Sequence, residues 1–185
     1  MAKPSYSSSS LQESSQKILS STAIISEEVP PEYVPRVLGF LQNVGVSALV
    51  PDHCNAKEFC SNLVSGLIKP LNISRGHVTC LLNVKPAVAN YFGSLHGGAV
   101  GAVAEAISIA CARTVVAEDK ELFLGELSIS YLSGAPMDAA VIVDGHVVRS
   151  GRNLTVVTVD FKLKETEKLV YVARATFYNM PVAKL

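Results

Sequence analysis

Residues 97–117 read GGAVGAVAEAISIACARTVVA and form the most apolar segment of the chain, with only Glu105 and Arg113 as charges. The many small residues allow other backbone to approach closely, so the pattern predicts a buried helix. We do not expect this helix to span a membrane. Glu105 interrupts the run, and the apolar stretches on either side fall short of the roughly 18 residues that a bilayer requires.

Period-two patterns flank this segment. Before it, the alternating apolar positions of one strand are Val78, Cys80, Leu82 and Val84. After it, four more such segments lie near residues 122–132, 139–149, 153–164 and 168–179, joined by turns of hairpin length. This order predicts an α+β fold in which an antiparallel sheet, with one or two strands before the helix and four after it, wraps around one central helix. Edge strands rich in Val and Ile favour pairing with a second copy, so we expect at least a homodimer.

The composition sets limits on function. The chain has 185 residues, 49% of them hydrophobic and 17% charged, with 16 basic and 16 acidic side chains. Zero net charge provides no field of one sign to attract nucleic acid, which is therefore not an expected partner. The four cysteines form no CxxC pair and no cluster with histidine, which predicts reduced thiols inside a cell and neither a metal site nor a redox cofactor.

The chain divides by composition into a tail and a domain. Residues 1–35 are rich in serine, which predicts a disordered N-terminal tail. This tail lacks the apolar core of a secretory signal, and its lack of arginine argues against an organellar transit peptide. Residues 36–182 are expected to form a single folded domain, with short helices at 36–50 and 57–69 before the strands begin.

The segment before the central helix, residues 90–98, reads NYFGSLHGG. Gly97 and Gly98 stand where a helix N-terminus leaves backbone N–H groups without partners. A ligand carbonyl can approach such donors closely because glycine has no side chain, and the helix dipole favours negative charge on the carbonyl oxygen. The same glycines also fit a tight strand-to-helix turn with no chemical role.

Glu105 is the second anomaly, because a carboxylate on an apolar helix is costly to bury unless it is paired or faces a cleft. Arg113 lies two turns further along, too far to pair with it on one helix. A carboxylate in a cleft beside an oxyanion site can activate a water for attack on an acyl carbonyl. Arg149 and Arg152 flank a hairpin turn, where they either bind a phosphate or are simply solvated.

Other candidates have weaker support. Ser94 and Ser108 lack a GxSxG turn, so covalent serine catalysis is not expected. Cys111 follows Glu105 by six residues, which places it on a different face of the helix, in the core. His77 and His146 have no partner visible in the sequence and are interpreted as structural.

As a combination, several of these motifs resemble the hotdog-fold acyl-CoA thioesterases of the phenylacetate-degradation and mammalian thioesterase-superfamily-member type, including plant peroxisomal members. The resemblance spans residues 78–178. It rests on Asn90, on His96-Gly97-Gly98, on Glu105 nine residues after that histidine, on GELSISYL at 125–132 and on VRSGRN at 148–153. It implies a long helix wrapped by an antiparallel sheet, in agreement with the strand order above.

The resemblance also implies roles for single residues in catalysis. The Gly97 N–H polarises the thioester carbonyl, with Gly98 beside it in the substrate site. Asn90 and His96 position the thioester or the water. Glu105 of the neighbouring subunit activates that water or attacks as a nucleophile, which makes the site a property of a dimer.

The remaining implied roles concern substrate binding. Ser133 and Gly134 match the loop that passes the pantetheine, and Arg149 and Arg152 match a region that holds the CoA phosphates. Leu124 departs from the pattern, because relatives place a serine or threonine there that helps to orient water. The CoA is part of the substrate, so no separate cofactor is expected.

We therefore expect an acyl-CoA thioesterase of lipid metabolism, a homodimer or homotetramer that hydrolyses a fatty or aromatic acyl-CoA to free acid and CoA. A dehydratase or hydratase of the same fold would use a His-centred motif that is not found. The alternative is a hotdog protein that binds acyl-CoA or a fatty acid without turnover, which Leu124 makes credible. The C-terminal Ala183-Lys184-Leu185 is similar to a peroxisomal targeting tripeptide and implies an import receptor as partner, with the cytoplasm as the alternative location.

Overall fold

The computed structural model describes residues 24–43 and 54–182. The chain divides into two units, residues 1–59 and 60–185. The first contains helix α2 (Val34–Asn43). Most of the Ser-rich tail and the tripeptide at 183–185 lie outside the described residues, so the expectations for both stay predictions.

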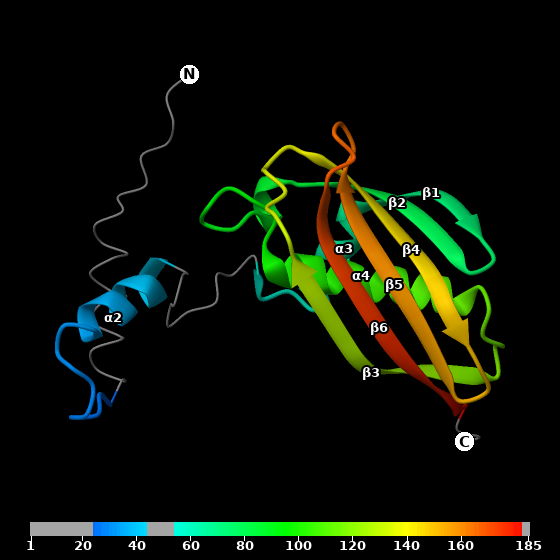
Figure 1. Ribbon diagram of the computed structural model, residues 1–185, viewed down its shortest axis with the longest axis horizontal. Coiled ribbons are helices and arrows are strands. Elements are labelled where there is room, and N and C mark those ends of the chain that lie inside the picture. Colours follow the sequence, from blue (N-terminus) through cyan, green and yellow to red (C-terminus); the bar gives the residue numbers. More distant parts are fainter. Residues whose placement is uncertain (1–23, 44–53, 183–185) are drawn as a thin grey trace. The chain divides into compact units, whose positions relative to one another are not determined.

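The second unit is a six-stranded sheet with one long helix (Figure 1). Its elements are α3 (Phe59–Leu67), β1 (Ile68–Ser74), β2 (His77–Asn83), the 3-10 turn η2 (Pro86–Val88), α4 (Gly97–Arg113), β3 (Lys120–Tyr131), β4 (Ala140–Ser150), β5 (Leu154–Leu163) and β6 (Leu169–Pro181). The strands lie in the order β1-β2-β4-β5-β6-β3, and all neighbours are antiparallel. The predicted α+β architecture, with four strands after the central helix, is confirmed. The prediction that hairpins join all four strands is wrong at the first connection: β4, β5 and β6 follow one another as hairpins, whereas β3 pairs with β6 and the chain crosses the sheet from β3 to β4.

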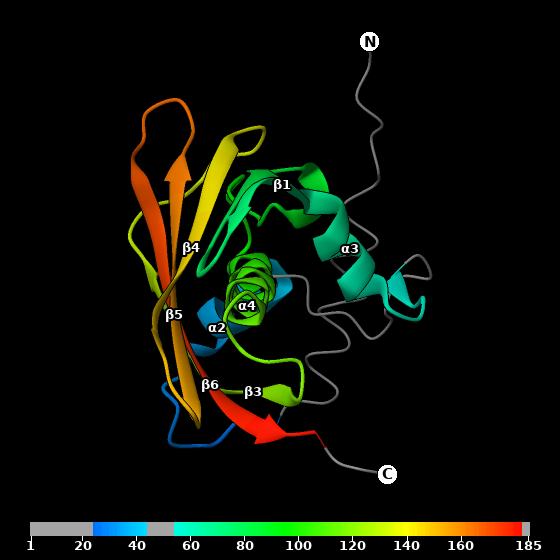
Figure 2. The ribbon, with the colours of Figure 1, turned by 90° about the vertical axis from the view of Figure 1, so that its right-hand side faces the viewer.

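Helix α4 packs on the concave face of the sheet, as Figure 2 shows. Its buried side chains, which include Val103, Ile107 and Cys111, meet the inward-facing residues of β4 and β5. Helix and sheet approach most closely at Gly145 of β4, where a Cβ atom would lie 2.7 Å from Cys111 Sγ and 2.7 Å from Ile107 Cγ2. A glycine is required at this position because no room remains for a side chain.

The structure also departs from the sequence predictions at helix α4 and at strand β1. Helix α4 is buried only on the side that faces the sheet, and Glu105 and Arg113 are exposed on the other. Strand β1 begins at Ile68, inside the range predicted as helix, and Ile68 pairs with Leu82 of β2. Nearly the whole of β1 is exposed, so it lacks the apolar alternation from which a strand is recognised. No helix within residues 24–43 or 54–182 is both long and apolar enough to cross a membrane.

Candidate active site

Asn90 builds the turn that leads to helix α4. Its side-chain Oδ1 accepts hydrogen bonds from Phe92 N at 3.0 Å, Ser94 N at 3.1 Å and Ser94 Oγ at 3.2 Å. Gly93 closes the turn with a φ of 74°, in the left-handed region that favours glycine. With its oxygen committed to the turn, Asn90 has the amide Nδ2 left to donate to a ligand.

The two glycines at the N-terminus of α4 differ in their hydrogen bonds. His96 is the N-cap, and its Nδ1 accepts from Gly98 N at 3.0 Å, so the ring proton is carried on Nε2 when the histidine is neutral. Gly97 N has no acceptor within residues 24–43 and 54–182. Its carbonyl accepts from Tyr131 Oη at 3.0 Å, and a Cβ on Gly97 would lie only 3.4 Å from that oxygen. Of the two glycine N–H groups at this helix end, that of Gly97 is therefore the one available to a ligand.

The loop that carries Ser133 and Gly134 lies against the same turn. Leu95 N donates to Ala135 O at 2.8 Å, and a Cβ on Gly134 would lie 3.4 Å from Ser94 Cβ. Ser133 Oγ accepts from Lys168 Nζ at 3.1 Å. The structure thus gathers Ser133 and Gly134 with Asn90, His96 and Gly97 at one end of the sheet.

The same loop is anchored to the core by Tyr171. Ala135 N donates to Tyr171 Oη at 2.9 Å. Burial raises the pKa of Tyr171, so the phenol stays protonated at neutral pH. A neutral, buried anchor holds the loop without adding charge to the site.

Glu105 lies away from this cluster. It lies eight positions after Gly97 on the same helix, which corresponds to a rise of about 12 Å along the helix axis. It is exposed and lines a cleft of about 400 Å³ between α3 and α4, with Ser65 and Ile109 among the other lining residues. Arg113 donates to Lys120 O at 2.7 Å instead of pairing with Glu105. One protomer therefore does not bring the acid to its own Gly97.

Arg149 and Arg152 are also remote from Gly97 within one protomer. Both are exposed near the β4–β5 turn, and Arg152 lines a cavity with residues 115–117, just beyond the end of α4. The length of α4 places this end about 24 Å from Gly97. Leu124 is half-buried on β3, where it packs against the core beside a register shift in the β3–β6 pairing.

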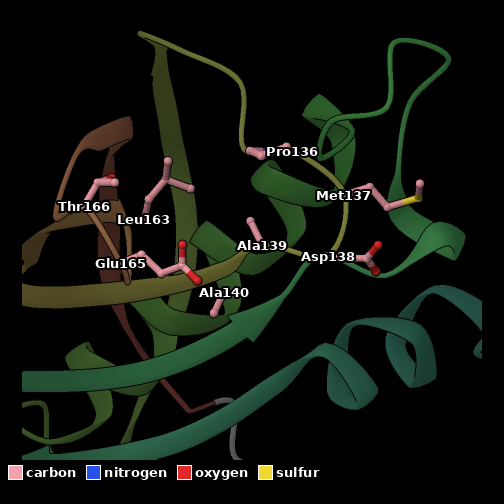
Figure 3. Close-up of a pocket in the computed structure, with 8 residues that line it drawn as sticks. All are labelled: Pro136, Met137, Asp138, Ala139, Ala140, Leu163, Glu165 and Thr166. Atoms are coloured by element: carbon pink, nitrogen blue, oxygen red, sulfur yellow. The ribbon is translucent and has the colours of Figure 1, made fainter.

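Two cavities lie near the helix N-terminus end of the sheet. Figure 3 shows one of about 260 Å³ between the start of β4 and the β5–β6 hairpin, with the carboxylates of Asp138 and Glu165 in its lining. None of the predicted site residues lines it. The other, of about 200 Å³, is lined by His96 and Gly98 and by apolar residues of α3. The sequence predicts this helix but gives its residues no part in the site, because they belong to none of the recognised motifs.

Among the described residues, the cysteines and the histidines of the sheet form no second site. All four cysteines are free thiols, and burial raises the pKa of Cys111 to about 11. No group of three His, Cys, Asp or Glu side chains in the described part of the chain is placed to hold a metal ion. His77 and His146, which showed no partner in the sequence, contact Asp144 at 2.7 Å and Thr158 at 2.8 Å on the opposite face of the sheet from α4.

A six-stranded antiparallel sheet around one long helix is the hotdog fold, and here a backbone donor stands at the N-terminus of that helix. Residues 92–170 match the thioesterase superfamily. Residues 92–170 of this chain, which include helix α4 and most of the strands that pack on it, are therefore similar to a thioesterase-superfamily domain.

Curated proteins and solved structures also resemble this chain. Human acyl-coenzyme A thioesterase 13 is 28% identical over 113 residues, which are 61% of this chain and 80% of that protein. Zebra fish thioesterase superfamily member 2 has a TM-score of 0.61 and 24% identity, over 68% of this chain and 89% of its own. The protein smu.793 from Streptococcus mutans UA159, solved bound to acetyl CoA, has a TM-score of 0.58 and 24% identity, over 63% of this chain and 91% of its own.

Proposed function

We propose that this protein hydrolyses acyl-CoA thioesters to a free acid and CoA. The observation that carries the proposal is the Gly97 N–H at a helix N-terminus, which has no acceptor among the described residues and is flanked by Asn90 and His96. Such a donor stabilises the oxyanion that forms when water adds to a thioester carbonyl. The naming of human acyl-coenzyme A thioesterase 13 and the acetyl CoA bound to smu.793 support a CoA thioester as substrate.

In the proposed reaction, the thioester carbonyl oxygen accepts from Gly97 N–H. A carboxylate removes a proton from water, and the water oxygen bonds to the carbonyl carbon. The tetrahedral intermediate then collapses as the carbon–sulfur bond breaks, and the proton passes from the carboxylic acid to the departing thiolate. Asn90 Nδ2 and His96 position the thioester or the water.

The carboxylate is Glu105 of a second copy of the chain, because Glu105 lies about 12 Å from Gly97 of its own protomer. Strand β3 is an edge of the sheet and exposes Phe123 (63%) and Tyr131 (55%), which favours pairing with a second copy. We therefore propose a homodimer, or a homotetramer built from two such dimers. In the same dimer Arg149 and Arg152 bind the CoA phosphates across the interface, and Ser133 and Gly134 line the path of the pantetheine.

The proposal is tested by thiol titration of CoA release from acetyl-, octanoyl- and phenylacetyl-CoA. Glu105→Gln is expected to lower kcat by about 10²–10⁴, the range for loss of a general base, while Glu118→Gln, an exposed acid beyond the end of α4, retains parental activity. Single turnover in ¹⁸O water separates the two roles of Glu105, because label enters its carboxylate only if it acts as a nucleophile. Full activity in Glu105→Gln would refute its role.

The dimeric nature of the site has its own test. Glu105→Gln and Asn90→Ala subunits are each expected to be nearly inactive alone. When they are mixed and reassociated, half of the dimers are mixed, and each of these has one undamaged site, so about a quarter of parental activity returns. No recovery from verified mixed dimers would place both residues in one protomer.

A second candidate function is acyl-CoA binding without turnover, favoured by Leu124, whose side chain packs in the core and offers no hydroxyl to water. Saturable binding of octanoyl-CoA without CoA release by the parent protein would establish it. We also propose a peroxisomal location through Ala183-Lys184-Leu185, with the cytoplasm as the alternative. A fluorescent fusion that ends in this tripeptide, compared with one that lacks it, tests the import receptor as a partner.

A further inference from the structure

The pocket beside the helix N-terminus is lined mainly by apolar groups from three elements. Leu63, Val64 and Leu67 of α3 form one wall, and η2 contributes Ala87 and Val88. The floor is α4 itself, at Ala99 and Ala102. Figure 2 shows α3 on the same side of the sheet as α4. The polar residues at its edge are His96, Gly98 and Cys60, so the pocket opens at the candidate active site.

The surface of α4 that faces away from the sheet is unusual in composition. Gly98, Ala102, Ala106 and Ile109 recur on one face, and Glu105 is the charged residue among those that line its two cavities. The outward face of a helix in a globular domain is ordinarily polar. This apolar face, partly covered by α3, has the character of a surface that contacts an apolar group.

We propose that this pocket holds the hydrocarbon chain of the substrate, so that the enzyme prefers straight medium-chain acyl groups of about eight carbons. The inference rests on the proposed function. Gly97 N–H fixes the carbonyl one residue from Gly98, which lines the pocket, so the carbons attached to that carbonyl start at its opening. The other half of the substrate carries phosphates and a polar pantetheine, which an apolar pocket disfavours.

The size of the pocket sets the expected chain length. A volume of about 200 Å³ accommodates about six or seven methylene-sized groups, taking about 30 Å³ for each, as for liquid water. Each methylene buried in an apolar site strengthens binding by about fourfold. We therefore expect kcat/KM to rise about fourfold per carbon from acetyl-CoA towards octanoyl-CoA and to level off beyond it.

Two alanines of α4 provide a matched test. Ala99 lines this pocket only, Ala106 lines only the neighbouring cleft around Glu105, and both are half-buried. Leucine adds three carbons at either position and suits a helix. Ala99→Leu is expected to lower kcat/KM for octanoyl-CoA by about sixtyfold, three factors of four, and to leave acetyl-CoA within threefold of the parent. Ala106→Leu, beside Glu105, is expected to change kcat/KM for both substrates by the same factor, so that the ratio of octanoyl-CoA to acetyl-CoA stays that of the parent.

The opposite pattern, with loss of octanoyl-CoA in Ala106→Leu and not in Ala99→Leu, would overturn the inference and place the chain in the cleft around Glu105. If Ala99→Leu lowers kcat/KM equally for both substrates and also changes the oligomeric state measured by light scattering, a second copy of the chain fills the pocket and the inference is overturned. If the parent releases no CoA from any substrate, the proposed function fails. The affinity for octanoyl-CoA, measured by calorimetry, then tests whether the pocket holds the hydrocarbon chain, because Ala99→Leu weakens binding only if the chain lies there.

Discussion

Replacement of Gly145 by alanine tests the tight contact between helix α4 and the sheet. An added Cβ would lie 2.7 Å from Cys111 Sγ and from Ile107 Cγ2, and both side chains are almost fully buried. Heavy atoms do not approach this closely, so α4 or both side chains must move. Because α4 carries Gly97 and Glu105, any shift is transmitted to both ends of the proposed site.

The expected cost is that of overpacking, about 1–3 kcal/mol. This is a large part of the roughly 5–15 kcal/mol that stabilises a domain. In urea, monitored by circular dichroism, the midpoint should fall without a change in the m-value. Gly66→Ala is the matched control, because nothing lies within 4 Å of its added Cβ in helix α3, and alanine there should stabilise by up to about 1 kcal/mol.

A double variant isolates the contact. Cys111→Ala removes one of the two groups that the new Cβ would meet, so Gly145→Ala should cost less in that background, with a coupling of at least about 0.5 kcal/mol. An unchanged urea midpoint in Gly145→Ala, or strict additivity in the double variant, would refute the idea that helix and sheet are in tight contact here.

Two further predictions concern stability. Ser108 Oγ is buried and has no hydrogen-bond partner in the described part of the chain, so Ser108→Ala should raise the free energy of unfolding by about 1–3 kcal/mol; a lower urea midpoint would contradict this. Burial acts to raise the pKa of Asp144, but hydrogen bonds from Thr79 and His77 outweigh it and hold the pKa below its ordinary value. A lowered pKa stabilises the folded state above the ordinary carboxyl pKa, about 4, and this contribution is lost as the pH falls through the folded value. Asp144→Asn should therefore have a lower free energy of unfolding than the parent at pH 6, and the difference between the two proteins should narrow below pH 4. If urea titrations give a difference that stays constant with pH, the Asp144 charge is not involved.

Most of the architecture could be predicted from local patterns. The strands β3 to β6 alternate because one face meets the core and the other meets water, and the apolar run at 97–117 marks the central helix. The end of that helix was placed four residues too late, because Thr114 turns the chain with its hydroxyl on Cys111 O at 2.6 Å. A side-chain hydrogen bond of this kind does not alter the hydrophobic pattern.

The candidate site was predicted as a set of residues and not as an arrangement. Spacing singled out Gly97 and Glu105, because glycines at a helix start and a carboxylate on an apolar helix are anomalies in one dimension. His96 entered only through the resemblance to the hotdog thioesterases. The spacing did not show that the Gly98 N–H donates to His96 Nδ1 while the Gly97 N–H stays available to a ligand. It also did not show the apolar wall formed by α3, whose residues gain meaning only where they face α4.

The sequence by itself determined the kind of elements, their order and the chemically unusual residues, because periodicity and residue type are local properties. The tertiary structure alone decided which of these residues meet. The rise of α4 puts Glu105 about 12 Å and the end of the helix about 24 Å from Gly97, while the loop at 133–136 folds back onto the turn at 90–95. Proximity across a fold depends on helix length and strand register acting together, and no single stretch of sequence contains that information.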